Sequence, residues 1–292
     1  QKIGIIVGLL ILILISADNI YAGGAGTTGA NFLKIGLGAK ASAMGDAFTA
    51  LADDGSCLYW NPAGLVQLKD KQLLVSYNSW FAGIRRGYIS FTLPLSKGES
   101  AGAGMNYLDM GTLEGRDEEG NPTSDFGASD FQLTIGYAKK FSDKFTAGLS
   151  GGILQDTIAG DKKNTYSVNA GVLFLPEESF SLGLSVQNIG PKLSGDNLPL
   201  TLKLGAAKKI KSLTLAADIS KPADNEMYFS IGGEWGIRKD LFLRVGYKSN
   251  QDIASGITIG AGLKWREIGL DYAYVPYGDL GDTHRISIVM KL

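Results

Sequence analysis

The stretch FQLTIGYAKKF, residues 131–141, alternates between apolar and polar or small side chains. Its apolar set is Phe131, Leu133, Ile135, Tyr137 and Phe141, and the intervening residues are Gln132, Thr134, Gly136 and Ala138. Successive side chains of a β-strand point to opposite faces, whereas helical spacing would scatter these apolar residues around a cylinder. The stretch therefore predicts a strand with one apolar face and one polar face.

The same alternation recurs along the rest of the chain, for example in YSVNAGVLF (166–174) and FSLGLSVQN (180–188). It predicts fourteen strands, over residues 71–81, 84–95, 99–110, 126–141, 144–156, 163–174, 179–189, 198–209, 211–221, 226–237, 240–248, 255–264, 266–275 and 282–292. Strands of about ten residues have the length needed to cross a bilayer at a tilt. We therefore expect membrane-spanning strands.

The connections between these strands alternate in length. The tight ones are expected at 96–98, 142–143, 176–178, 209–211, 238–239 and 265–266, and the longer ones at 109–125, 157–163, 190–197, 222–226, 249–254 and 276–281. Outer-membrane barrels have short periplasmic turns and longer outside loops, and an even strand number places both ends of the sheet on the periplasmic side. The pattern indicates an antiparallel barrel of this kind.

Polar residues identify the face that would line the lumen: Gln132, Asn169, Lys203, Asp218, Glu234, Arg244, Lys264 and Asp271. A soluble β-sandwich, the alternative, would bury the apolar face instead. Aromatic residues favour the barrel, because those with apolar-face parity beside tight turns fit an interfacial girdle. These are Phe141, Phe145, Phe174, Phe180, Trp235 and Trp265. Residues 70–292 are thus expected to form an all-β, 14-stranded antiparallel transmembrane β-barrel.

The N-terminal residues resemble a secretion signal. Lys2 precedes thirteen apolar residues, 3–15, and the small residue Ala22 follows. Thirteen residues make about 20 Å of helix, which is shorter than a bilayer core of about 30 Å. We therefore expect a signal peptide over residues 1–22, with cleavage after Ala22. A retained membrane anchor is the alternative.

The overall composition excludes several functions. The 292 residues carry a formal net charge of −1, which argues against nucleic acid as a partner. The single cysteine and single histidine leave no metal cluster or serine–histidine constellation, so we expect neither an enzyme nor a metal or cofactor. Residues 109–125 gather acidic side chains that could bind Ca²⁺, but they lack the EF-hand order. A solvated outside loop is the favoured interpretation of that stretch.

A different signal stands before the strands, in CLYWNPAGL, residues 57–65. Proline cannot donate to a strand ladder. Asn61 can instead cap a short helix, and Pro62 can occupy its first position, where a missing N–H is no loss. The stretch predicts a helix start outside the barrel wall.

The region around this motif resembles the PorV/PorQ family of barrels, related to the FadL long-chain fatty-acid transporters. The matching residues are Phe32, Leu33, Ile35, Gly36, Gly38, Ala39, Met44, Gly45, Ala47, Phe48, Ala52, Asp53, Asp54, Ser56, Tyr59, Trp60, Asn61, Pro62, Ala63, Gly64 and Leu65. The fourteen-strand count agrees with that superfamily. The chain is shorter than typical members of the PorV type, so their long outside loops are in doubt.

The resemblance implies that residues 23–69 fold inside the barrel as a hatch, or plug. A fourteen-strand cylinder is too wide for wall side chains alone to fill. The hatch motif comprises Gly36, Gly38, Gly45, Phe48, Asp53, Asp54, Tyr59, Trp60, Asn61, Pro62, Ala63 and Gly64. Its glycines would let hatch backbone approach wall backbone. Asp53 and Asp54 would pair with Lys203, Arg244 or Lys264, or accept backbone N–H groups. Plug architecture without ligand contact is the favoured interpretation.

Two functions follow from the resemblance, both in the outer membrane of a Gram-negative-type bacterium. The first is an accessory role in type IX secretion, with secretion-system proteins and secreted cargo as partners. The second is FadL-like transport of a hydrophobic molecule such as a long-chain fatty acid. A structural barrel that only holds partners is a third alternative. A transporter needs an apolar pocket, whereas the expected lumen residues are polar and glycine-rich. The sequence therefore favours secretion.

Overall fold

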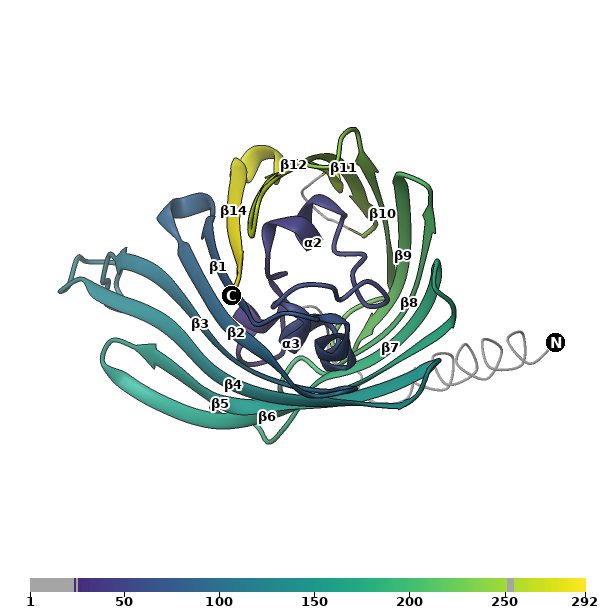
Figure 1. The fold of residues 1–292 in the computed structure, drawn as a ribbon. Helices are drawn as coiled ribbons and strands as arrows, with labels where there is room; N and C mark the ends of the chain where they lie inside the picture. The colour runs from purple at the N-terminus through teal and green to yellow at the C-terminus, as the bar shows by residue number, and fades with distance from the viewer. Residues whose placement is uncertain (1–23, 25, 251–254) are drawn as a thin grey trace.

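The computed structural model describes residue 24, residues 26–250 and residues 255–292. The predicted signal peptide, residues 1–22, lies outside the described residues. The described chain forms a closed barrel of fourteen antiparallel strands in which sequence neighbours pair all the way round (Figure 1). Its bounds are β1 Gln72–Ser79, β2 Arg85–Ser96, β3 Glu99–Leu113, β4 Phe126–Ser142, β5 Phe145–Ile158, β6 Asp161–Glu177, β7 Phe180–Ile189, β8 Thr201–Ile210, β9 Leu213–Pro222, β10 Tyr228–Gly236, β11 Leu241–Lys248, β12 Ile257–Trp265, β13 Ile268–Pro276 and β14 Asp282–Lys291. The predicted strand number is confirmed.

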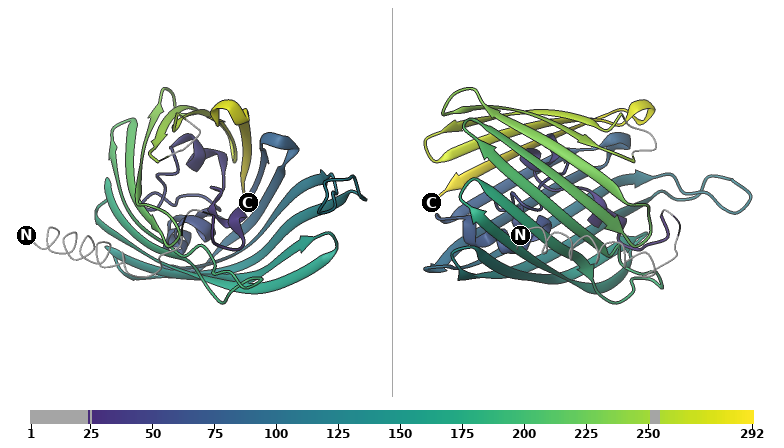
Figure 2. Two further views of the ribbon diagram at one scale, coloured as in Figure 1. Left: turned by 180° about the vertical axis from the view of Figure 1, so that it is seen from behind. Right: turned by 90° about the vertical axis from the view of Figure 1, so that its right-hand side faces the viewer.

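The first and last strands close the barrel. β1 pairs with β14 from Gln72 opposite Lys291 to Ser79 opposite His284. Closure leaves no open edge, which matters in hydrocarbon because each unpaired backbone group there costs several kcal/mol. The strands are tilted relative to the barrel axis, and the C-terminus lies at the opposite end from the long β3–β4 hairpin (Figure 2).

The wall has an apolar outer face and a polar inner face, as the alternation in the sequence predicted. On β4, Leu133, Ile135 and Tyr137 are exposed on the outer face, with 68% of Ile135 accessible, whereas Gln132 and Thr134 are buried inside. An outward apolar band around a polar interior is the arrangement of a membrane barrel and the inverse of a soluble sandwich. The sandwich alternative is excluded by the closed sheet.

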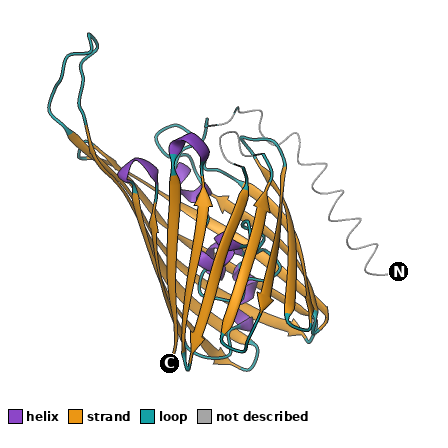
Figure 3. Ribbon diagram, turned by 90° about the horizontal axis from the view of Figure 1, so that it is seen from above, coloured by secondary structure: helices purple, strands orange, loops and turns teal. Residues whose placement is uncertain are grey.

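The described turns confirm the alternation of lengths, with one exception, and residues 251–254 of the predicted loop at 249–254 lie outside the described residues. The predicted longer connection at 157–163 is wrong, because β5 and β6 continue to Ile158 and Asp161 and join through two residues. Those residues, Ala159 and Gly160, have φ values of 51° and 88°. Two consecutive positive φ values make the tight hairpin turn whose twist matches that of the flanking strands. The hairpin between β3 and β4 remains the most prominent projection (Figure 3).

Aromatic side chains gather at both ends of the barrel. At the tight-turn end, Phe141, Trp235 and Trp265 are exposed on the outer face, in keeping with an interfacial girdle. At the other end, the rings of Trp80 and Tyr277 pack at a tilt, with their centroids 5.0 Å apart. Within the described part of the chain, no helix is both long and apolar enough to cross a membrane.

The helices of the described residues are short, and most precede the barrel. They are η2 Asn31–Lys34, α2 Ala39–Ala43, α3 Cys57–Trp60, η3 Pro62–Gln67, η4 Phe81–Gly83 and η5 Gly278–Leu280. The first four belong to residues 26–71, which we call the inner segment because it lies within the ring of strands (Figure 1). This segment contributes no strand to the wall.

Candidate functional site

The inner segment occupies the lumen and touches nearly every side of the wall. α2 packs against β11, β12, β13 and β14, whereas η3 packs against β3, β4, β5 and β6. Three of its large side chains, Phe48, Leu58 and Trp60, are at most 1% exposed. The segment and the wall therefore share one interior.

Glycines of the wall allow this close packing. A methyl group on Gly246 of β11 would collide with the backbone of Met44 and Gly45. Conversely, a methyl group on Gly45 would lie 2.7 Å from the nitrogen and 2.8 Å from the oxygen of Tyr247. Gly136, Gly171 and Gly260 leave room for the side chains of Leu58, Asn61 and Ala43. Four other inward-facing glycines leave room for backbone of the inner segment: Gly148, Gly183, Gly205 and Gly232. Backbone lies against backbone because these positions carry no side chain.

From the sequence, the glycines that let the two backbones approach each other were expected in the inner segment rather than in the wall. Of the glycines named there, Gly45 does face the wall backbone. Gly36, Gly38 and Gly64 instead face Asp46, Ser56 and Ala52 of the inner segment itself. The expectation was wrong for these three, because the segment folds onto itself before it meets the wall. The wall glycines could have been identified in the sequence as glycines at those alternate positions of a predicted strand that face the lumen.

The side chain of Asn61 connects the inner segment to the barrel wall. Its Oδ1 accepts from the N–H of Ala63 at 3.1 Å, with Pro62 at the first position of η3. Its Nδ2 donates to the carbonyl oxygens of Thr49 at 2.8 Å and Val172 of β6 at 3.1 Å. The N-cap expected from the sequence is present. The same side chain also binds Val172, which lies 111 positions further along the chain.

Polar side chains of the wall bind the backbone of the inner segment. Asp218 Oδ2 accepts from the N–H groups of Phe48 at 3.0 Å and Thr49 at 2.9 Å. Gln187 Nε2 donates to the carbonyl oxygens of Tyr59 and Trp60. Buried polar backbone needs such partners, since an unsatisfied group costs about 1–3 kcal/mol.

Three other predicted lumen residues lie on the inner face. The ammonium of Lys203 sits 4.5 Å from the centre of the Trp60 ring, a cation–π contact. Asn169 Nδ2 donates to Ser150 Oγ, which in turn donates to the carbonyl of Leu58. Gln132 is 6% exposed on the same face. These groups surround α3 rather than converging on one point.

The remaining predicted charges do converge, near the tight-turn end of the lumen. Arg244 of β11 donates to Glu234 of β10 at 2.7 Å and to Asp271 of β13 at 2.6 Å. Lys40 of α2 lies 2.7 Å from Asp53 and 3.9 Å from Glu234. This charged cluster, defined by Lys40, Asp53, Glu234, Arg244 and Asp271, links the inner segment to strands β10, β11 and β13.

A cavity of about 220 Å³ lies against the charged cluster. Asp54, Gln72 and Lys264 also line it, and Lys264 is exposed at its mouth. Asp53 pairs with Lys40, not with any of the three wall cations that the sequence suggested. Asp54 accepts from the backbone N–H of Ser56 at 2.8 Å. Lys40 escaped the sequence analysis because its partner is thirteen residues away, beyond one helical turn.

Burial raises the pKa of Asp54 to about 6, and the neighbouring Asp53 adds to the effect. The hydrogen bonds from Ser56 act in the opposite direction. A carboxyl group that is desolvated without a cation of its own favours the neutral form. The carboxyl group of Asp54 therefore changes its charge near pH 6.

An apolar cluster fills the lumen at the opposite, long-loop end. Phe32 and Leu33 of η2 are at most 4% exposed and pack with wall and loop leucines: Leu108, Leu154, Leu193 and Leu198. The N–H of Gly29 donates to the carbonyl of Asn197 in the β7–β8 loop at 2.9 Å, and Lys34 pairs with Asp224. The apolar volume near the outside is thus occupied by the chain's own side chains.

The described residues contain no group of three or more His, Cys, Asp or Glu side chains that could hold a metal ion. The acidic residues between β3 and β4 are exposed. In that loop Asp117 accepts hydrogen bonds from the backbone and the side chain of Asn121.

Comparison with known proteins places these features in a family. Residues 22–211 match the family described as "Type IX secretion system protein PorV". A search of curated proteins finds no match to the sequence. The matched range covers the inner segment and the wall from β1 to β8.

Solved structures share the fold at low sequence identity. The CymD monoaromatic hydrocarbon channel has a TM-score of 0.70 and 11% identity, over 88% of this chain and 98% of CymD. The Pseudomonas putida toluene transporter TodX has a TM-score of 0.63 and 14% identity, over 92% and 97%. A Pseudomonas aeruginosa FadL homologue has a TM-score of 0.59 and 12% identity, over 83% and 95%. At these identities the likeness shows a shared fold.

Proposed function

Since the chain belongs to the PorV family and lies in the outer membrane of a Gram-negative-type bacterium, we propose that it serves type IX secretion as a plugged barrel. In this role it receives secreted proteins, or helps to attach them, at the outer membrane. The observation that carries the proposal is the family match over residues 22–211, a range that includes the whole inner segment.

The packing of the lumen supports a barrel that works with its interior closed. The inner segment is bound to the wall through Asn61, Asp218 and Gln187, and through the charged cluster. Wall glycines such as Gly246 lie directly against the backbone of the inner segment. A barrel filled in this way offers partners its loops, its turns and its outer wall, so cargo would be handled at those surfaces.

The experiment is deletion of the gene in its own host, with secreted cargo followed in each compartment. The expected result is cargo held in the periplasm and restored to the cell surface by the intact chain. Cargo that reaches the surface normally in the deletion strain would refute the proposal. Heat-dependent gel mobility of the complementing protein checks that the barrel has folded.

Transport of a hydrophobic small molecule is the second candidate, and the fold shared with CymD and TodX supports it. In this reading, movement of η2 would free the apolar volume that Phe32 and Leu33 occupy. The test is binding of a fatty acid to the purified barrel, compared with a Phe32→Ala, Leu33→Ala double variant. Transport predicts binding that increases in the double variant, and the absence of binding in both proteins contradicts it.

A further inference from the structure

Two apolar grooves cross the outer wall of the barrel. The first has a volume of about 620 Å³ and runs from β7 to β12, and the second, of about 460 Å³, runs from β4 to β7. Both lie on the face that carries the exposed apolar residues, so in the membrane they open toward lipid. They are distinct from the lumen and from the charged cluster.

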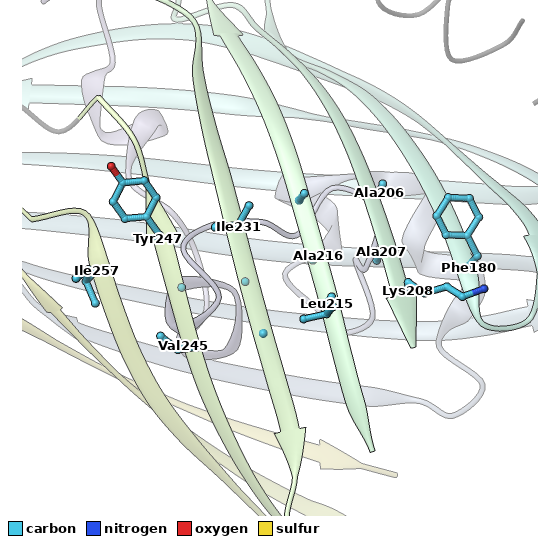
Figure 4. A pocket seen from close by; sticks show the side chains of 14 residues that line it. Phe180, Ala206, Ala207, Lys208, Leu215, Ala216, Ile231, Val245, Tyr247 and Ile257 are labelled. Carbon is cyan, nitrogen blue, oxygen red and sulfur yellow. The ribbon is translucent and has the colours of Figure 1, made fainter. Parts of the chain in front are cut away.

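The first groove exists because small residues face outward on adjacent strands. Ala206 of β8 lies opposite Ala217 of β9, and Gly233 of β10 lies opposite Leu215. Larger side chains stand at the ends, with Tyr247 and Ile257 at one and Phe180 and Lys208 at the other (Figure 4). A row of small side chains between large ones forms a groove. Its depth is the difference in length between the large and the small side chains.

The second groove repeats this construction. Its floor includes Ala147 and Ala170, which lie opposite Val172 and Leu149 on the same outer face. Tyr137, Lys139 and Phe141 line its β4 side. The two grooves share an apolar body, a lysine and a phenylalanine, although they are built from different strands.

Each lysine forms an ion pair with a glutamate. Lys208 Nζ lies 3.0 Å from Glu177 and 5.6 Å from the centre of the Phe180 ring. Lys139 Nζ lies 2.7 Å from Glu99. All these residues stand beside the tight turns, at the end of the barrel where the chain finishes. The ion pairs therefore lie at the periplasmic interface of the membrane.

A molecule that fits the apolar groove and the ion pair beside it has an apolar chain and a headgroup with one positive and one negative charge. Association within a membrane depends on van der Waals packing and polar contacts rather than on escape from water. Each well-placed pair of heavy atoms contributes about 0.1–0.2 kcal/mol, so a groove that surrounds a chain holds it better than a flat wall. The phosphate of a zwitterionic lipid complements the lysine, and its ammonium complements the glutamate.

We propose that each groove holds an acyl chain of a zwitterionic phospholipid from the periplasmic leaflet. The chain lies over Ala206, Ala217 and Gly233 in the first groove and over Ala147 and Ala170 in the second. The headgroup engages Lys208 and Glu177, or Lys139 and Glu99. These sites give the barrel bound lipid at fixed positions on its wall.

The test is native mass spectrometry of the barrel in mild detergent with added phosphatidylethanolamine or phosphatidylglycerol. The wild type should retain phosphatidylethanolamine in preference to the anionic lipid. Ala217→Phe should weaken retention in the first groove about tenfold, equivalent to about 1.4 kcal/mol. The double variant Ala217→Phe, Ala170→Phe should lose both sites. Ala261→Phe, on the outer face of β12 and in the lining of neither groove, is the matched control and should retain lipid as the wild type does.

Charge-reversal variants test the contribution of the ion pair between Lys208 and Glu177. Lys208→Glu alone should abolish the headgroup preference at the first groove, whereas the exchanged pair Glu177→Lys, Lys208→Glu should keep it. Heat-dependent gel mobility shows that each variant is folded. Equal lipid retention by Ala217→Phe and Ala261→Phe would overturn the proposal. A wild-type dimer that Ala217→Phe converts to a monomer would also overturn it, because the groove would then be an interface between copies.

Discussion

Replacement of Asn61 by alanine tests whether the inner segment is fixed by the contacts described above. The side chain is fully buried and makes three hydrogen bonds, to Ala63, Thr49 and Val172. Asn61→Ala removes all three without adding bulk. The barrel wall should persist, because its own ladders do not depend on this side chain.

The magnitude follows from the bonds that are lost. Loss of a helix N-cap costs about 1 kcal/mol. The carbonyl of Thr49, left buried without its donor, adds about 1–3 kcal/mol. The free energy that opposes local opening of the inner segment should therefore fall by roughly 2–4 kcal/mol. Since about 1.4 kcal/mol is a factor of ten, opening should become roughly 30 to 700 times more frequent.

Hydrogen exchange measured by mass spectrometry reports this opening directly. Peptides that cover residues 44–66 should exchange faster by that factor in Asn61→Ala, while peptides from β4 and β5 stay unchanged. Asn225→Ala, the same substitution in an exposed loop, is the control and should leave both regions unaltered. Protection of residues 44–66 that stays within about threefold of the wild type would refute the reasoning.

Three further predictions address the wall, the membrane face and the charged region. Gly246→Val should displace the inner segment, since even a methyl group there collides with Met44 and Gly45, and protease cleavage of the segment in the folded barrel should reveal it. Ile135→Arg, on the lipid face, should destabilise the barrel by about 2–4 kcal/mol in urea unfolding from bilayers, and an unchanged midpoint would place this face away from hydrocarbon. Because the pKa of Asp54 is raised from 3.8 to about 6, its stabilisation is complete below pH 4 and is lost as the pH rises through 6. Protection of the surrounding backbone should thus fall by up to about a hundredfold over that range in the wild type, and the fall should be absent in Asp54→Asn.

The wall of this protein could be predicted from local pattern alone. Strand number, the facing of residues such as Ile135 and Gln132, and the tight turns all follow from a period of two, which is a property of each strand by itself. The exception at 159–160 arose because a turn of two residues and a longer loop have similar composition, and only the pairing of β5 with β6 distinguishes them.

The contents of the lumen depended on the tertiary structure. Sequence singled out Asn61, Asp53 and Arg244 by residue type, yet it could not show that Asp53 pairs with Lys40 or that Arg244 bridges Glu234 and Asp271. Partners in an interior are chosen by barrel closure and register, which bring together residues from distant strands. Periodicity therefore determined which way each side chain points, and closure of the ring determined what it meets there.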